Sequence, residues 1–395
     1  MFLTRFLLRV FFALLSFPFF AKGETPYTTV DIFPAGNKHT HSSSIVQCPN
    51  GDLLACWYHG SGERTADDVV VQGARLKKGA KHWGPVFEMA DTPDFPDCNP
   101  ILHIDPEDRL RLFWVSVLAN RWECSLLKVK LAEDFQGHGP PIWSWQDIVP
   151  LKPGPKFAQT MKQRFEEIKL NTAMWAEYAR PYEDLLLKAA LDPFKRQTGW
   201  MPRTKPLNLP NGRILLPLYS DGFNVSLIAI SDDNGDTWRT SQPIIGLGPI
   251  QPSLARRRDG TIIAFCRDSG PPPGRVMTSF SHDNGETWNA AQDTTLPNPG
   301  SSLDVIVLQD GQWLIVYNDS NKSRDNLTVA ISMDEGKTWP LKSRLEPQED
   351  GATSFSYPSV IQSANGTVHI SYTCKGARGS RIRHGILQPT QIKAQ

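Results

Sequence analysis

The residues whose type and spacing best suit acid–base chemistry are two histidines near the start of the chain. His39 and His41 stand at the entry to an apolar stretch, in the run HTHSSSIV. An imidazole titrates near neutral pH, so a histidine in this place could act as a general acid or base. For either residue alone, a hydrogen bond to backbone at a strand edge explains its presence equally well.

Other chemistries lack the residues they need. The sequence has no His/Cys/Asp/Glu group with zinc-ligand spacing and no EF-hand pattern. It also lacks a phosphate-binding glycine loop, a dinucleotide-binding fingerprint and the G-x-S-x-G motif of esterases. We therefore expect no cofactor and no catalytic metal. The sequence leaves open whether a structural calcium ion lies in a central channel.

Composition narrows the class of partner. The chain has 42 basic and 41 acidic residues, with no block of one sign. This balance argues against nucleic acid or an anionic membrane as the main partner. Six cysteines occur without C-x-x-C pairs, so both disulfides and buried thiols remain open.

The first 23 residues have the features of a secretory signal peptide. Arg5 and Arg9 precede an apolar run, and small residues follow it at Ala21–Gly23. A retained N-terminal anchor is the alternative. No later stretch reaches the roughly 18 apolar residues of a spanning helix. We expect a secreted or periplasmic monomer with no membrane span in its mature chain, residues 24–395.

A repeated motif sets the architecture. The pattern S-x-D-x-G-x-T-W begins at Ser231, Ser281 and Ser332, so its copies lie 50 and 51 residues apart. A fixed period of this size indicates a repeat fold. Its Asp can accept backbone hydrogen bonds in a tight turn, its Gly can adopt positive φ, and its Trp offers an apolar plate.

A second periodic signal agrees with the first. Six pairs of apolar strands flank short turns of the Asn-Gly or Asp-Gly kind, which favour two-residue hairpins. The turns are Asn50-Gly51, Glu107-Asp108, Asn211-Gly212, Asp259-Gly260, Asp310-Gly311 and Asn365-Gly366. We predict an all-β, six-bladed β-propeller of four-stranded blades.

One interval is about twice as long as the others. Residues 157–197 carry a helical apolar pattern, interrupted by Pro181 and Pro193. We predict a helical insertion between blades 2 and 3. It serves either as a lid over the substrate face or as a packing appendage on the rim.

The repeated motif resembles the Asp box of the sialidase (neuraminidase) superfamily, and the chain as a whole resembles its BNR/Asp-box sialidase-like proteins. The resemblance implies a six-bladed propeller with its site on the axis and with the boxes in peripheral turns. It places Arg267 and Arg324 among the arginines that bind a substrate carboxylate. It places Tyr357, in SFSYPSV, at the position of the nucleophile.

The chain departs from the family pattern in two places. Gln251 stands where the family has the glutamate that activates the tyrosine, and an amide cannot accept the phenol's proton. The HTHSSS run with His41 stands where the first arginine is expected. The family's acid falls in the loop that contains Glu63. Glu349 and Asp350 are close in sequence to Tyr357.

Further residues at predicted strand ends face the axis. They could bind sugar hydroxyls, or they could satisfy backbone groups in loops; they are His39, Asn99, Arg203, Gln251 and Asn318.

We expect a sialidase-like exo-glycosidase, a hydrolase that removes a terminal acidic sugar from a carbohydrate substrate. Arg267 and Arg324 would bind the acid group, and Tyr357, His41 and Glu63 would carry the chemistry. The alternatives are a rhamnosidase or uronate lyase on the same propeller, and a glycan-binding propeller without turnover.

Overall fold

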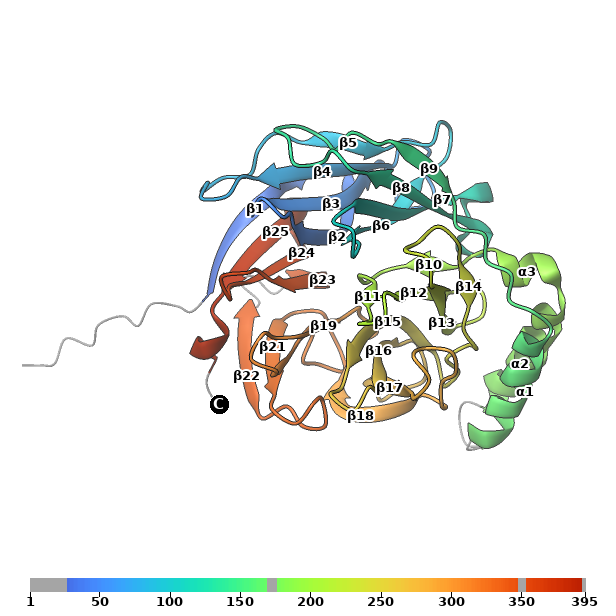
Figure 1. Cartoon of the computed structure of the whole chain (residues 1–395). Coiled ribbons are helices and arrows are strands. Elements are labelled where there is room, and N and C mark those ends of the chain that lie inside the picture. The colour runs from blue at the N-terminus through green and yellow to red at the C-terminus, as the bar shows by residue number, and fades with distance from the viewer. Residues whose placement is uncertain (1–26, 169–175, 347–352, 393–395) are drawn as a thin grey trace, which may run out of the picture.

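The computed structural model describes residues 27–168, 176–346 and 353–392. The predicted signal peptide lies outside these residues. Six antiparallel sheets surround a central axis (Figure 1). The prediction of a six-bladed β-propeller is confirmed. Within the described residues, no helix has the length and apolar character needed to cross a membrane.

Each blade runs from the axis to the rim. Blade 1 comprises β2 (His39–Gln47), β3 (Leu53–Gly60), β4 (Val70–Leu76) and β5 (Phe87–Ala90). Blade 2 comprises β6 (Asp97–Ile104), β7 (Leu110–Val117), β8 (Ser125–Ala132) and β9 (Trp145–Ile148). Two short 3-10 turns, η1 (Leu118–Asn120) and η2 (Trp122–Cys124), join β7 to β8.

The inner strand of blade 3 is split into two short pieces that both pair with β12. Its strands are β10 (Met201–Pro202), β11 (Leu207–Asn208), β12 (Ile214–Ser220), β13 (Val225–Ser231) and β14 (Arg239–Thr240). Blade 4 comprises β15 (Pro249–Arg256), β16 (Ile262–Asp268), β17 (Arg275–Ser281) and β18 (Gln292–Pro297). Blade 5 comprises β19 (Asp304–Val307), β20 (Trp313–Tyr317), β21 (Leu327–Ser332) and β22 (Leu341–Glu346).

Blade 6 closes the ring with a strand from the other end of the chain. Its strands are β23 (Ser354–Gln362), β24 (Val368–Gly376), β25 (Gly379–Leu387) and β1 (Tyr27–Gly36), and the 3-10 turn η3 (Pro389–Gln391) follows. Tyr27 at the start of β1 pairs with Leu387 at the end of β25. The Tyr27 hydroxyl also donates to the Tyr372 hydroxyl at 3.0 Å. The first described strand is therefore fastened to the last blade.

The hydrophobic core lies between neighbouring blades. One cluster combines Leu215 and Ile230 of blade 3 with Leu254 and Ile262 of blade 4. Similar clusters join the other blades in turn. All six cysteines are free thiols, and five of them are buried in this packing.

The six predicted hairpins are present, but the prediction of two-residue turns is wrong. In blade 1 the Cys48 N–H donates to Asp52 O, and the Gly51 N–H donates to Cys48 O. The loop therefore has three residues and ends in a left-handed residue, which is the type I turn with a bulge. The other five hairpins repeat these two bonds, with Asp108 (φ 57°) replacing the glycine in blade 2.

The three Asp boxes join blades 3, 4 and 5 each to the blade before it. Within the first box the Thr237 N–H donates to Asp233 Oδ1 at 2.9 Å, and the Trp238 indole donates to Gly235 O at 3.1 Å. The carbonyl of Asn234, where φ is 58°, then faces blade 2 and accepts from Arg111 Nη2 at 2.5 Å. The next two boxes use the same geometry: Arg213 donates to Asn284 O, and Arg257 donates to Glu335 O.

The insertion forms α1 (Lys156–Ile168), α2 (Ala176–Leu191) and α3 (Pro193–Gln197). The helices lie outside the ring, beside β13 and β14 (Figure 1). Phe157, Met161 and Phe165 of α1 enter the core cluster that contains Trp200 and Phe223. No described residue of the insertion lines the axial cavity. Of the two roles considered, the structure supports a packing appendage.

Arg111 allows a test of the link between blades. Its guanidinium is 1% exposed and contacts Asp105, whose carboxylate is fully buried, at 3.2 Å. We expect Arg111→Met to lower the free energy of unfolding by about 3–5 kcal/mol, because a buried carboxylate loses a partner. The exposed pair of Arg258 and Glu335 is the control. Arg258→Gln should change stability by less than about 1 kcal/mol in urea unfolding. Equal effects of the two variants would contradict this account.

Buried histidines give the fold an acid limit. Burial lowers the pKa of His103 and His369 to about 4 and the pKa of His384 to about 3. The unfolded chain titrates near 6.5, so below that pH it binds more protons than the folded chain. Stability should therefore fall as the pH is lowered from about 6.5 towards 4.

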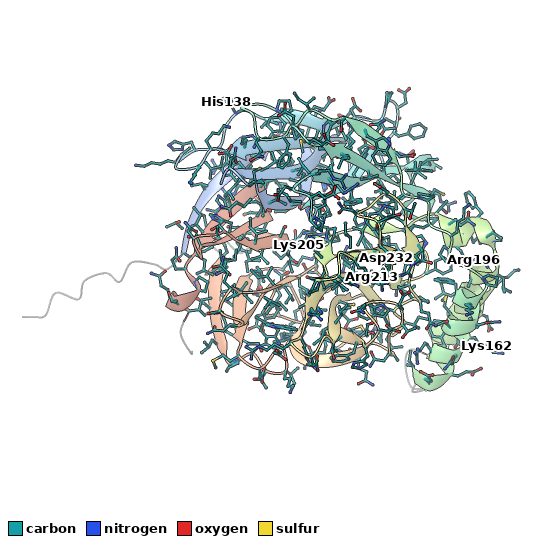
Figure 2. All side chains as sticks on the ribbon, in the orientation of Figure 1. His138, Lys162, Arg196, Lys205, Arg213 and Asp232 are labelled. Atoms are coloured by element: carbon teal, nitrogen blue, oxygen red, sulfur yellow. The ribbon has the colours of Figure 1, made fainter. Side chains whose placement is uncertain are left out.

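The size of this effect can be measured by urea unfolding across that pH range. His384→Gln should reduce the slope of the unfolding free energy against pH by up to about 1.4 kcal/mol per pH unit, which corresponds to the uptake of one proton. His138→Gln is the control, because His138 is exposed at the outer edge of the molecule (Figure 2). An unchanged slope in His384→Gln would show that this histidine does not limit acid stability.

Candidate active site

A cavity of about 480 Å³ opens on the axis at one face of the ring. Eight of the ten predicted site residues line it; they are His39, His41, Glu63, Asn99, Gln251, Arg267, Arg324 and Tyr357. They come from five of the six blades and from distant parts of the sequence. The propeller thus brings these residues together.

A repeated backbone distortion presents several of these side chains. Ser42, Asn99, Gln251 and Tyr357 all have φ between 52° and 57°. Each lies at a β-bulge in the innermost strand of its blade. A left-handed residue other than glycine costs on the order of 1–3 kcal/mol, and such strain concentrates at functional sites. This strain supports a functional role for the axial face.

The phenol of Tyr357 receives two hydrogen bonds. Gln251 Nε2 and Arg267 Nη1 each donate to its oxygen at 3.2 Å. Gln251 Oε1 in turn accepts from Arg267 Nη1 at 3.5 Å. The amide therefore acts as a donor to the phenol, where a carboxylate would have accepted its proton. Glu349 and Asp350 lie outside the described residues.

Arg324 stands beside the same tyrosine. Its guanidinium carbon is 5.9 Å from the centroid of the Tyr357 ring, and its Nη2 donates to Gly300 O at 2.7 Å. Burial lowers the pKa of Arg324, but a guanidinium remains charged in proteins. Arg267 and Arg324 thus place two positive charges in the cavity wall.

The His41 imidazole packs against the Tyr357 ring at a centroid distance of 4.2 Å. Its Nδ1 lies 3.0 Å from Thr373 Oγ1. Burial, then His39 and the nearby arginines, hold the pKa of His41 well below its usual range. His41 is therefore neutral at pH 7 and can accept a proton. Burial also lowers the pKa of His39.

Carboxyl groups occupy another part of the cavity lining. The Tyr58 hydroxyl, fully buried, donates to Glu63 Oε1 at 2.5 Å. Asp221, which follows β12, also lines the cavity, and desolvation raises its pKa. Sequence reasoning missed Asp221, together with Trp122 and Lys375.

The spacing from the turn glycine of the hairpin could have indicated that Asp221 and Lys375 line the cavity. In blades 3, 4 and 6 the residue seven positions after the turn glycine lines the cavity; these residues are Tyr219, Arg267 and Thr373. Because strand side chains alternate, positions nine after the glycine reach it too. Those residues are Asp221, Ser269 and Lys375.

Two predicted binding residues require correction. Arg203 is 1% exposed, and its guanidinium lies 4.7 Å from the centroid of the Tyr357 ring, donating to Ser43 O and Pro358 O. Asn318 is also 1% exposed and donates to the backbone of Phe355. Neither residue lines the cavity, because neighbouring inner strands bury both side chains.

Comparisons with known proteins agree with this architecture. A BNR repeat-like domain matches residues 192–370. A sialidase of Micromonospora viridifaciens is 28% identical over 152 residues, which is 36% of this chain and 22% of that protein. A sialidase of Paraclostridium sordellii is 24% identical over 179 residues, 40% of this chain and 43% of that protein. The chain thus matches less than half the length of these two relatives.

Solved structures share the fold. A Hadza microbial sialidase superposes with a TM-score of 0.69 at 15% identity, covering 92% of this chain and 69% of that one. The intramolecular trans-sialidase of Ruminococcus gnavus gives 0.65 at 14% identity, covering 90% of this chain and 96% of that one. The chain thus contains a BNR repeat-like domain, is similar in sequence to sialidases, and has the propeller fold of solved sialidases.

Arg267 provides a test of charge recognition in the cavity. We expect Arg267→Gln to weaken binding of glucuronate or free sialic acid about 10- to 100-fold, the value of one charge-assisted hydrogen bond. Binding of a neutral hexose should change little. Calorimetry measures both affinities, and Arg275→Gln, a variant of the same blade outside the cavity lining, is the control. Equal losses for acidic and neutral sugars would contradict recognition of the carboxylate.

Proposed function

We propose that the protein is a secreted, sialidase-like exo-glycosidase that hydrolyses the bond to a terminal acidic sugar. One observation carries this proposal: Arg267, Arg324 and Tyr357 meet in one cavity of about 480 Å³. This volume lies in the usual range for small-molecule sites. Two guanidinium groups match a carboxylate in charge and in hydrogen-bond geometry.

The carboxylate of such a substrate explains the choice of nucleophile. A carboxylate nucleophile would be repelled by the acid group beside the anomeric carbon, whereas a phenol is not. Tyr357 lies between the two cavity arginines and the neutral His41. His41 accepts the phenol proton as the Tyr357 oxygen attacks the anomeric carbon.

Secretion is part of the proposal and rests on the sequence of residues 1–23. Extracellular glycans are the substrates that an exo-glycosidase would meet there.

A second candidate is a rhamnosidase or lyase that acts on a uronate linkage. It is favoured by Gln251, which leaves the tyrosine without the usual carboxylate, and by the neutral His41. The arginines would then neutralise the uronate, and His41 would move the proton. A glycan-binding propeller would use the same arginines without turnover.

Activity of the purified mature protein separates these functions. We expect release of sialic acid from an aryl sialoside, with a loss of about 100-fold or more in Tyr357→Phe, because the nucleophile is removed. Tyr27→Phe, in the outer strand of blade 6, is the matched control. Gln251→Glu restores an acceptor beside the phenol and should raise kcat, while its competition for Arg267 should raise KM.

The other outcomes assign the other functions. Turnover of a rhamnose–glucuronate oligosaccharide alone, abolished in His41→Ala, would establish the uronate-directed enzyme. Binding of either glycan without turnover would leave a glycan-binding protein and overturn the hydrolase.

A further inference from the structure

The cavity lining contains an acid that the proposed mechanism has not used. Asp221 follows β12, where the strand alternation directs it into the lining with Glu63 and Trp122. Asp221 is an exposed residue of the cavity lining. It interacts electrostatically with Arg267, which also bonds Tyr357. Asp221 therefore lies within charge range of the reacting centre.

Glu63 and Asp221 differ in their hydrogen bonding. One oxygen of Glu63 is held by the Tyr58 hydroxyl at 2.5 Å, so this carboxyl is arranged as an acceptor. Among the described residues, no side chain or backbone N–H donates to the Asp221 carboxyl. A carboxyl group without donors lacks the hydrogen bonds that would favour its ionised form.

The electrostatic surroundings favour the same assignment. Desolvation raises the pKa of Asp221, while Arg267 opposes the shift and Glu63 adds to it. His41 carries the opposite shift, so it is a poor donor at neutral pH. Two groups with pKa values displaced in opposite directions are the arrangement that acid–base catalysis requires.

We propose that Asp221 is a catalytic residue, the proton donor to the leaving oxygen in the glycosidic reaction. The proposal rests on the proposed function. It assigns to Asp221 the acid role that the family resemblance suggests for Glu63.

The reaction has two stages, and each proton released in one stage is returned in the other. Asp221 gives its proton to the glycosidic oxygen as the bond from that oxygen to the anomeric carbon breaks, and the electron pair stays on the oxygen. The phenol proton passes to His41, and the Tyr357 oxygen bonds to the anomeric carbon. A water oxygen then displaces the tyrosine, its proton goes to the Asp221 carboxylate, and His41 returns the phenol proton.

The test compares leaving groups on one acidic sugar. A nitrophenol leaves without help, whereas a simple alcohol needs a proton. In the mature protein, Asp221→Asn should lower kcat/KM for the alkyl glycoside at least about 100-fold, within the usual range for loss of a general acid. The loss on the nitrophenyl glycoside should be less than about 10-fold. The basic limb of the alkyl pH profile should also disappear.

Two controls accompany this comparison. Asp293→Asn removes another carboxyl whose pKa is raised by burial, on β18 and outside the cavity lining, and should leave both rates unchanged. Glu63→Gln should affect the two leaving groups alike. Unchanged unfolding of Asp221→Asn in urea shows that the variant is folded.

The experiment distinguishes failure of the proposed function from failure of the role assigned to Asp221. If the unaltered protein turns over no acidic glycoside, the proposed function fails and the role of Asp221 fails with it. If the protein is active and Asp221→Asn loses activity equally on both leaving groups, or loses none, only the role of Asp221 is overturned.

Discussion

The structure depends on a buried ionic network beneath the cavity. Arg203 is fully enclosed under the Tyr357 ring and donates to backbone oxygens of blades 1 and 6. Asp304 of blade 5, 1% exposed, accepts from Lys205 of blade 3 at 2.6 Å and from Ser253 of blade 4 at 2.8 Å. It also accepts from the backbone of Val360 in blade 6 at 2.8 Å. Lys205 lies near the middle of the ring (Figure 2).

This network performs a task that apolar packing between blades cannot. The clusters between blades fix each blade against its neighbours, but apolar contacts are non-directional. Charge-assisted hydrogen bonds that join blades 1, 3, 4, 5 and 6 are directional, so they also restrict how these blades can shift along the axis. The bulges at Asn99, Gln251 and Tyr357 then bring their side chains into the same cavity. Strain at these bulges is sustained because the surrounding sheets hold both ends of each inner strand.

The limits of sequence reasoning follow from the same geometry. Blade number and hairpin positions were predictable, because the boxes and turn residues act locally and recur with a period. The turn type was not, because Asn-Gly fits both a two-residue turn and the three-residue loop found here. Most of the correctly predicted cavity residues were reached through the family resemblance. Asp221 required counting positions along each strand from its turn.

The burial of individual polar side chains was the property hardest to predict from the sequence. Arg203 and Asn318 have residue types common in sugar sites, and each directly follows a strand, β10 and β20 respectively. Their exclusion from the cavity depends on how deeply each inner strand is seated, which only the contacts among all six blades determine. A polar residue at a propeller axis can therefore bind a ligand or support the residue that does.

The charges around Tyr357 explain why an amide, Gln251, occupies the place of a carboxylate. Arg203 lies against the Tyr357 ring, Arg267 bonds its oxygen and Arg324 stands beside it, so the phenol already faces three guanidinium groups. A carboxylate at position 251 would neutralise part of this charge and would compete with the substrate acid for Arg267. The amide instead donates to the same phenol oxygen, and its own oxygen accepts from Arg267 at 3.5 Å without neutralising the guanidinium charge. Removing the proton acceptor at this position therefore keeps more positive charge for the substrate and shifts the acid–base work to His41 and to the carboxyl groups in the cavity wall.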